Sequence, residues 1–351
     1  MTYNQSTIHF GNLQEVQFNE LLKNQFGDSK KIILTDETIS ELWISHLITS
    51  FSELARAEII QIPSGEENKT LGVCEQIWEV LSEYEISRSD LIINFGGGVI
   101  TDMGGLIASL FKRGLTFINI PTTLLAQVDA SIGGKTAIDL GPYKNQIGVF
   151  SDAKHVFIDD QFLTTLADEQ LYSAYAEMLK HGLIADPDYW EKLKSFDPKK
   201  PENRLKYTIQ SVNIKKSIIE QDYKEKSLRK ILNFGHTIGH GVEGFLLNNN
   251  TPTLHGYAVA WGMRAESFIS YKKGFIAKDE FNDINSHLEK VFPKFEIDPI
   301  HFKTIIQLLY NDKKNNSGQI QFSLISNIGK GIYNQNVTDI EIIESLKMLT
   351  K

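Results

Sequence analysis

Short apolar runs alternate with longer amphipathic stretches through the first half of the chain. The runs are rich in Ile and Leu and end at glycine, proline or acidic residues, which is typical of buried strands. Val73, Ile77 and Leu81 recur at helical spacing, and a further helix is expected over 99–111. Strands are predicted at 31–35, 58–63, 91–95 and 115–120. Strands that alternate with helices in this way indicate parallel βαβ units.

From about Leu166 onward the apolar residues follow the helical period. Residues 319–325 alternate like a strand, which we expect to belong to a hairpin ending near Tyr333. We therefore expect an α/β domain over residues 1–162 and a mostly α-helical domain over residues 163–351. Helices are predicted over 171–183, 202–221, 228–247, 257–271, 281–291 and 302–310.

Composition limits the class of protein. A chain of 351 residues is too long for one ordinary domain, so two domains are the natural expectation. The net charge of −8, without any basic run, argues against nucleic acid as a partner. No apolar run approaches the ~18 residues that span a membrane, and the polar N-terminus shows no apolar secretory segment. The simplest expectation is a cytoplasmic protein without a membrane partner.

The stretch 229–240 concentrates candidate chemistry. Asn233, His236 and His240 are spaced by three and four, which puts them on one face of the predicted helix. The two glycines beside them each cost the helix roughly 1 kcal/mol, which indicates that something approaches the backbone closely. Because Cys74 is the only cysteine, any metal must bind His, Asp or Glu. Two histidines one turn apart are weak evidence for zinc by themselves, and surface histidines are the alternative.

A triple glycine, Gly96 to Gly98, joins the third predicted strand to the helix after it. Such a turn lets the backbone pass close to an anion, and the helix N-terminus supplies free N–H groups and a positive dipole. The position suits a phosphate, although the run is not the G-x-G-x-x-G fingerprint and does not follow the first strand. A tight turn without a ligand is the alternative. Asp102 in the helix that follows is explained equally well by the helix dipole alone.

Glycines interrupt the segment 128–148, which we expect to be a long structured loop. Long loops inside a compact domain are often functional. The segment carries Lys135, Lys144 and Asn145 among few acidic residues. Ammonium and amide groups suit the oxygens of a phosphate or carboxylate, so we favour anion binding over solvated surface lysines.

Several runs together resemble the 3-dehydroquinate synthases, members of the sugar phosphate cyclases. The resemblance covers nearly the whole chain in order, and several runs are long enough to be specific. The runs that carry it are Gly96–Asp102, Ile120–Thr136, Lys144–Gly148, Ala176–Lys180, Leu228–His240, His255–Gly256 and Asp312–Lys314.

The resemblance implies an N-terminal Rossmann-like domain that holds NAD and a mostly α-helical C-terminal metal-binding domain, with the active site between them. The metal is expected to be zinc, with cobalt as the alternative, and a homodimer is implied. Glu177, His236 and His255 would be the ligands, a set that suits a catalytic metal with open positions. The implied NAD contacts are Asp36, Glu66, Lys69, Gly97, Gly98, Asp102, Thr122, Thr123, Asp129, Lys135, Lys144, Phe162 and Thr165.

The family's reaction converts 3-deoxy-D-arabino-heptulosonate 7-phosphate to 3-dehydroquinate and phosphate, in the shikimate pathway to chorismate and the aromatic amino acids. NAD is used and restored within one turnover. By resemblance His240 would move a hydroxyl proton, and a group of basic and polar side chains would hold the phosphate and carboxylate of the substrate. The implied substrate and catalytic residues are Arg113, Lys135, Lys144, Asn145, Lys180, Glu225, Arg229, Asn233, His240 and Lys313, with Lys314 as the alternative to Lys313.

Tyr257 departs from the family pattern, which commonly has Glu at this position. A carboxylate there would orient His255, so the substitution bears on metal tuning more than on the reaction class. Three alternatives remain open from the sequence. One is another sugar phosphate cyclase of the amino-dehydroquinate, inosose or valiolone type. The others are a metal-dependent polyol dehydrogenase, which would release NADH, and an inactive binding homologue.

Overall fold

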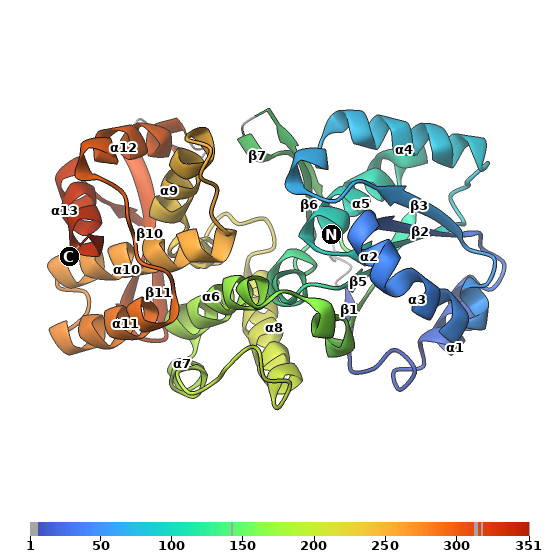
Figure 1. The fold of residues 1–351 in the computed structure, drawn as a ribbon, viewed down its shortest axis with the longest axis horizontal. Coiled ribbons are helices and arrows are strands. Elements are labelled where there is room, and N and C mark those ends of the chain that lie inside the picture. Colours follow the sequence, from blue (N-terminus) through green and yellow to red (C-terminus); the bar gives the residue numbers. More distant parts are fainter. Residues whose placement is uncertain (1–5, 142, 312–314, 317–318, 351) are drawn as a thin grey trace. The chain divides into compact units, whose positions relative to one another are not determined.

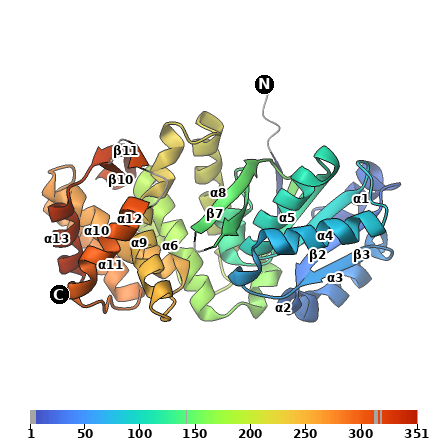
Figure 2. The same cartoon turned by 90° about the horizontal axis from the view of Figure 1, so that it is seen from above.

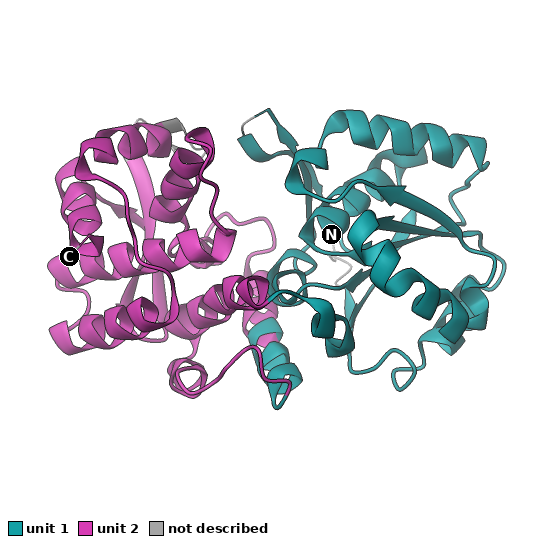
Figure 3. Ribbon diagram, in the orientation of Figure 1, with its two compact units in different colours: residues 1–167, 202–212 teal, residues 168–201, 213–351 magenta. Residues whose placement is uncertain are grey.

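The computed structural model describes residues 6–141, 143–311, 315–316 and 319–350. The chain divides into two compact units, which Figure 3 colours separately: residues 1–167 with 202–212, and residues 168–201 with 213–351. The expected domain boundary after residue 162 falls inside a 3-10 helix of the first unit, Asp160–Thr165. Among the described residues, no helix combines the length and the apolar character needed to cross a membrane.

The first unit is built on a six-stranded sheet in which every pair of neighbours is parallel, as the alternating pattern predicted. The four predicted strands are β2 to β5, while β1 and β8 were not predicted. The strands are β1 Thr7–Phe10, β2 Lys31–Asp36, β3 Glu58–Ile62, β4 Leu91–Gly96, β5 Thr116–Pro121 and β8 His155–Ile158. The helices are α1 Phe18–Phe26, α2 Glu37–Ile39, α3 Ser45–Ser50, α4 Leu71–Glu83 and α5 Gly98–Leu110.

Helices cover both faces of this sheet, and Figure 1 shows α4 and α5 on one side with α1 and α3 on the other. Because side chains alternate along a strand, each strand contributes to both layers. Ile33 and Ile93 join the apolar cluster with Phe18 of α1 and Leu47 of α3. Asn94, the next residue along β4, lies on the α5 face and is buried there. Burial on both faces explains why these strands are continuous apolar runs.

The strand order locates a binding position on the sheet. The strands lie in the order β1-β8-β5-β4-β2-β3. Without β1, the chain order of the strands across the sheet is 2-1-3-4-5, so the direction of winding reverses between β2 and β4. In doubly wound sheets, ligands bind outside the carboxyl ends of the strands at this reversal. Asp36 ends β2 and the glycine turn follows β4, so the two lie on the strands that flank this reversal. A ligand bound at the reversal can therefore meet a glycine turn that does not follow the first strand.

The segment 128–148 was expected to be a loop, and this prediction was wrong. A π-helical turn, Ala126–Ala130, leads into an antiparallel hairpin of β6 Lys135–Leu140 and β7 Tyr143–Phe150. Figure 2 shows β7 beside α5, and a Cβ on Gly105 of α5 would meet Thr136 of β6 at 2.5 Å. The glycines here allow the strands and the helix to approach each other closely. The sequence alone did not distinguish this use of glycine from its use in a loop.

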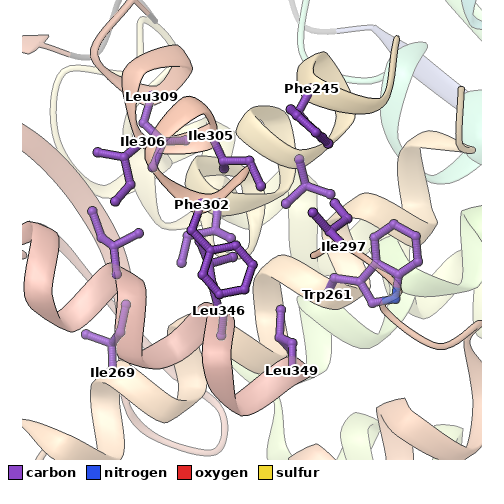
Figure 4. Packing of buried hydrophobic residues seen from close by; sticks show 14 of the residues in the cluster. Phe245, Trp261, Ile269, Ile297, Phe302, Ile305, Ile306, Leu309, Leu346 and Leu349 are labelled. Atoms are coloured by element: carbon purple, nitrogen blue, oxygen red, sulfur yellow. The ribbon is translucent and has the colours of Figure 1, made fainter. Parts of the chain in front are cut away.

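The second unit is mainly helical, as predicted, and contains a small antiparallel sheet. Its apolar core, part of which Figure 4 shows, joins α9, α10, α12, α13 and β10 through side chains such as Trp261, Phe302 and Leu346. The predicted hairpin is confirmed as β10 and β11. The elements are α6 Asp168–Ala185, α7 Pro187–Leu193, α8 Arg204–Gln221, α9 His236–Asn248, α10 His255–Lys272, α11 Lys278–Val291, α12 Phe302–Asn311, α13 Asp339–Leu349, β9 Asn315–Asn316, β10 Gln319–Asn327 and β11 Lys330–Asn336; α8 begins in the first unit and ends in the second.

The predicted helix 228–247 is broken, so the single helical face expected from Asn233 to His240 does not form. Residues Leu228–Asn233 are a 3-10 helix, and α9 begins only at His236. Gly235 separates them with φ of 80°, a left-handed conformation that glycine adopts without steric cost. The break makes His236 the first residue of its helix.

Candidate active site

Three helices of the second unit bring Glu177, His236 and His255 together. Glu177 lies in the middle of α6 and is fully buried, while His236 and His255 are the first residues of α9 and α10. Glu177 Oε1 is 3.4 Å from His236 Nε2 and 3.5 Å from His255 Nε2. The three side chains that sequence reasoning assigned to one cation therefore converge on one point.

The spacing of these atoms fits a metal centre. Ligand atoms about 2.0–2.2 Å from a tetrahedral zinc ion lie about 3.3–3.6 Å from one another. The two measured separations fall in that range. Glu177 Oε1 also accepts no hydrogen bond from the described residues, although it is buried. A buried carboxylate oxygen facing two imidazole nitrogens is the donor set that zinc and cobalt bind.

The remaining nitrogen of each histidine is held by a hydrogen-bond acceptor. His236 Nδ1 donates to the carbonyl oxygen of Phe234 at 3.1 Å. His255 Nδ1 lies 3.2 Å from Glu243 Oε2. In both rings the acceptor thereby holds a proton on Nδ1, and Nε2 faces Glu177, so a metal would bind at Nε2.

Glycines allow α9 and α10 to pack closely enough to hold this arrangement. A Cβ on Gly239 would lie 2.9 Å from the carbonyl oxygen of Ala258 on α10. A Cβ on Gly262 would collide with the carbonyl oxygen of Gly235. The close approach that the glycines beside the histidines indicated is thus the approach of α10.

A buried carboxylate fixes the start of α9. Glu266 of α10 is fully buried, and its two oxygens accept hydrogen bonds from the backbone N–H groups of Gly235 at 2.5 Å and Ile238 at 3.0 Å. The first N–H groups of a helix have no partner within the helix, and a negative charge is favourable there. Glu266 therefore anchors the helix end that carries His236.

The start of α10 is fixed against α6 in a similar way. Gly256 donates its backbone N–H to Ser173 Oγ at 3.0 Å, and a Cβ at this position would overlap the Ser173 carbonyl group. Ser173 lies one turn before Glu177 on α6. This contact sets the backbone of His255 beside the carboxylate.

The charges in this cluster are strongly coupled. Burial raises the pKa of Glu177, but Lys180 and His255 outweigh that effect, so its pKa lies well below the ordinary value. Burial lowers the pKa of His255, but the carboxylates of Glu177 and Glu243 raise it to about 10. Lys180 is nearly fully buried and forms an ion pair with Glu177. In the chain without a metal, cationic side chains therefore neutralise the buried carboxylate.

His240 lies one turn after His236 on α9. Its ring centroid is 5.2 Å from that of His236 and 5.8 Å from that of His255. Each of the three rings offers a nitrogen within 4.8 Å of the others. His240 is therefore close enough to the Glu177 cluster to exchange a proton with a molecule bound there.

Three of the residues expected at the substrate lie in or just before the 3-10 helix that precedes α9. Arg229 is buried and donates to the carbonyl oxygen of Tyr223 at 2.5 Å, and its backbone N–H donates to Asp222. Asn233 donates to Glu225 Oε1 at 2.5 Å. Arg229, Asn233 and Glu225 are thus positioned by one local network next to the start of α9.

In the first unit, the residues expected to bind NAD gather at the carboxyl ends of the strands. Asp36 at the end of β2 accepts hydrogen bonds from Ile39 N and Ser64 Oγ, both at 3.0 Å. Gly97 precedes α5, and a Cβ there would approach Thr123 to 3.0 Å. Thr122 is buried after β5, and its backbone N–H bonds to Gly96. Glu66 and Asp129 lie in short helical turns after β3 and β5.

Lys69 joins these NAD-side residues to the hairpin. Its side chain is 3% exposed and donates to Asp102 Oδ2 and Asn145 Oδ1, both at 2.7 Å. Burial lowers the pKa of Lys69, but Asp102 and Glu66 outweigh this, so the pKa lies above its ordinary value. Asn145 has φ of 54°, and its backbone N–H donates to Asp139 at 2.6 Å. With its oxygen on Lys69, the amide of Asn145 keeps N–H donors for an anion.

Some predicted residues lie apart from these groups. Arg113 follows the last turn of α5, a 13-residue helix that is about 20 Å long, whereas Gly97 and Gly98 lie at its start. The ring of Phe162 is buried between Phe95 and Trp43 in the core. Thr165 accepts a hydrogen bond from Trp43. Lys135 and Lys144 are on the hairpin strands β6 and β7, and Lys313 and Lys314 lie outside the described residues.

Sequence reasoning missed three residues that support the candidate metal centre, namely Ser173, Glu243 and Glu266. A signal for Glu243 exists in the sequence, since it lies seven residues after His236 and so shares its helical face. Ser173 and Glu266 act through contacts between helices, which no spacing within one helix reveals.

The sequence of this chain is similar to those of known proteins. Residues 59–173 match the family model "3-dehydroquinate synthase N-terminal", and residues 174–315 match "3-dehydroquinate synthase C-terminal". A 3-dehydroquinate synthase of Parabacteroides distasonis is 40% identical over 346 residues, covering 95% of this chain and 97% of the relative.

Solved structures of related enzymes share the fold. A 2-deoxy-scyllo-inosose synthase complexed with carbaglucose-6-phosphate, NAD+ and Co2+ has a TM-score of 0.85 at 25% identity, covering 97% of this chain and 96% of that one. The 2-epi-5-epi-valiolone synthase ValA from Streptomyces hygroscopicus, with NAD+ and Zn2+ bound, has a TM-score of 0.86 at 24% identity, covering 99% of this chain and 97% of that one.

Proposed function

Because this chain belongs to the 3-dehydroquinate synthase family, we propose that it converts 3-deoxy-D-arabino-heptulosonate 7-phosphate to 3-dehydroquinate and phosphate. The chain is an NAD- and metal-dependent carbon–oxygen lyase of the shikimate pathway. The single observation that carries the proposal is the convergence of Glu177 Oε1 with Nε2 of His236 and His255, at 3.4 and 3.5 Å. One carboxylate and two imidazoles form a ligand set that leaves open metal positions for a substrate.

Glu177, His236 and His255 hold one divalent ion, zinc or alternatively cobalt, and the carboxyl ends of β2, β4 and β5 hold NAD. When bound, the ion supplies polarisation of a substrate hydroxyl and NAD supplies a reversible oxidant for the same carbon. Asp36 at the end of β2 suits the ribose hydroxyls, and the start of α5 at Gly98 suits the pyrophosphate. The position of the winding reversal in the sheet supports these two assignments.

His240 is the proposed proton carrier. Imidazole changes its charge near neutral pH, and the ring lies within one helical turn of His236. Accepting the proton of the polarised hydroxyl at a ring nitrogen prepares the carbon for oxidation, and returning it completes the reverse step. The position of His240 beside the metal ligands supports this role.

The substrate's two acidic groups are held by separate sets of cations. Lys135, Lys144 and Asn145 on the β6–β7 hairpin bind phosphate, and Asn145 presents its N–H groups because Lys69 holds its oxygen. Lys180 and Arg229 in the second unit bind the carboxylate end. Holding both ends orients the substrate for β-elimination and for the later ring closure, which are intramolecular.

Arg113 supports a homodimer as the functional form. It matches a phosphate-binding position of the family, yet it lies beyond the far end of α5 from Gly98 in the same chain. A second copy of the chain can supply it across a two-fold interface. A cytoplasmic location stays a prediction, supported by the likeness to biosynthetic enzymes.

An assay with the purified chain, NAD, zinc and the heptulosonate phosphate tests the proposal. We expect release of equal amounts of phosphate and 3-dehydroquinate, with no net NADH. Net NADH accumulation without phosphate release would identify a polyol dehydrogenase instead. Turnover of glucose 6-phosphate or sedoheptulose 7-phosphate in preference to the heptulosonate phosphate would identify a cyclase of the inosose or valiolone type.

A further inference from the structure

His255 depends on a side chain, and not on the backbone, for the orientation of its ring. His236 is oriented by the carbonyl oxygen of Phe234, two residues earlier in its own segment. The partner of His255 Nδ1 is Glu243 Oε2 at 3.2 Å, on a different helix. His236 is therefore oriented by a backbone group and His255 by a side chain. Only the side-chain contact is removed by a single substitution.

The backbone around His255 is already fixed, so ring rotation is the freedom that remains. Gly256 is bonded to Ser173 Oγ at 3.0 Å and packed against the Ser173 carbonyl group. With its Cα and Cβ held in this way, the imidazole still rotates about χ1 and χ2. A hydrogen bond at Nδ1 selects the rotamer that turns Nε2 toward Glu177, 3.5 Å away.

Position 257 does not provide this hydrogen bond. The ring of Tyr257 packs against Phe292, with ring centroids 6.1 Å apart, and lies at the margin of the apolar core. Glu243 in contrast is 8% exposed and lies seven residues after His236, on the face of α9 that carries both histidines. The carboxylate that contacts His255 Nδ1 thus comes from α9 and not from position 257 of α10.

We propose that Glu243 is the positioning residue that commits His255 to metal binding through Nε2, in place of a carboxylate at position 257. This inference rests on the proposed metal site of the enzyme. Glu243 does not contact the ion. It fixes the tautomer and the rotamer of His255. Its removal should therefore lower metal affinity more than it lowers the stability of the fold.

Zinc affinity of the chain, measured by competition with a chelator, tests the inference. We expect Glu243→Ala to weaken zinc binding by about 10–100-fold, the range typical of lost hydrogen bonds to metal ligands. Glu243→Gln keeps an acceptor of the same size, so its loss should be smaller. Glu289→Gln, which removes a carboxylate paired with Arg264 at 2.8 Å elsewhere in the unit, should bind zinc like the wild type.

Two further readouts separate positioning from general stability. The unfolding temperature of the metal-free Glu243→Gln variant should match that of the metal-free wild type, and the absorption spectrum of its Co2+ form should change. If Glu243→Ala does not fold, the Gln variant decides the question through the same zinc titration. Wild-type zinc affinity in every folded Glu243 variant would overturn the inference and leave the metal site intact. A wild-type chain that binds no zinc would overturn the proposed metal site itself.

Discussion

At the scale of single residues, the environment of each histidine ring decides what it can do. His236 and His255 each have one nitrogen bonded to an acceptor and the other facing Glu177. The sequence identified these residue types and their spacing, but it did not determine which nitrogen carries the proton. That information comes from Phe234 and Glu243, whose contacts depend on the fold.

His155 on β8 provides a prediction at the same scale, away from the metal residues. It is 6% exposed, its Nδ1 lies 3.2 Å from His9 Nε2, and its Nε2 lies 3.2 Å from Gln25 Oε1. Burial, with His9 and Lys154, lowers its pKa from 6.5 to about 4. Between those two pH values the unfolded chain binds a proton that native His155 does not. The free energy of unfolding should therefore fall by about 3 kcal/mol as the pH decreases through this window.

Denaturant unfolding at a series of pH values from neutral to mildly acidic checks this expectation. His155→Gln removes the titrating ring and keeps a polar side chain next to His9 and Gln25. The variant should show a shallower dependence of unfolding free energy on pH than the wild type. Identical slopes for the two proteins would show that His155 does not titrate as its burial indicates.

At the scale of elements, the close packing of α9 against α10 determines the candidate metal site. Sequence patterns were sufficient for most helices and for four strands of the six-stranded sheet, β2 to β5, because their apolar residues form clear runs or repeats. They failed at the β6–β7 hairpin and at the break before His236, where glycines permit close approach or a positive φ. Glycine alone does not reveal which of these uses it serves.

Gly262→Ala tests the packing of these two helices. The added methyl group would meet the carbonyl oxygen of Gly235, which forces α10 away from the start of α9. We expect a loss of about 1–3 kcal/mol in unfolding free energy and weaker zinc binding, since His236 adjoins the displaced segment. Thermal unfolding and zinc titration measure the two effects.

Gly72→Ala in α4 is the matched control. A Cβ there approaches only Thr70 Oγ1, at 4.0 Å. Alanine is the better helix former, so this substitution should leave stability unchanged or raise it by up to about 1 kcal/mol. Equal destabilisation by both substitutions would remove the special role of Gly262.

At the scale of the whole molecule, the functional residues fall into two sets on two compact units. The resemblance of motifs in the sequence named candidate residues in both units, and their roles stay predictions. It was not enough to derive the strand order, which places the reversal of winding between Asp36 and Gly96 and so accounts for the first set. Strand order depends on contacts between segments that are distant in the sequence. The spacing of apolar residues within one segment carries no information on these contacts.

The position of Arg113 gives a prediction for the assembly. If a second copy supplies Arg113, Arg113→Ala and His236→Ala chains should each be inactive alone. A mixture refolded together should recover up to about a quarter of wild-type activity, since half of the dimers are mixed and each has one intact site. Co-refolded His236→Ala and His255→Ala chains, which lack ligands of the same set, should stay inactive. Absence of recovery in the first mixture would assign Arg113 to a role within its own chain.

The most direct test of the account is the position of the metal itself. Anomalous diffraction at the zinc edge from crystals of the wild-type chain grown with zinc would locate it. The account predicts one strong peak within about 2.0–2.2 Å of a carboxylate oxygen of Glu177 and of Nε2 of both His236 and His255. A peak that excludes Glu177, or the absence of any peak in this cluster, would contradict it.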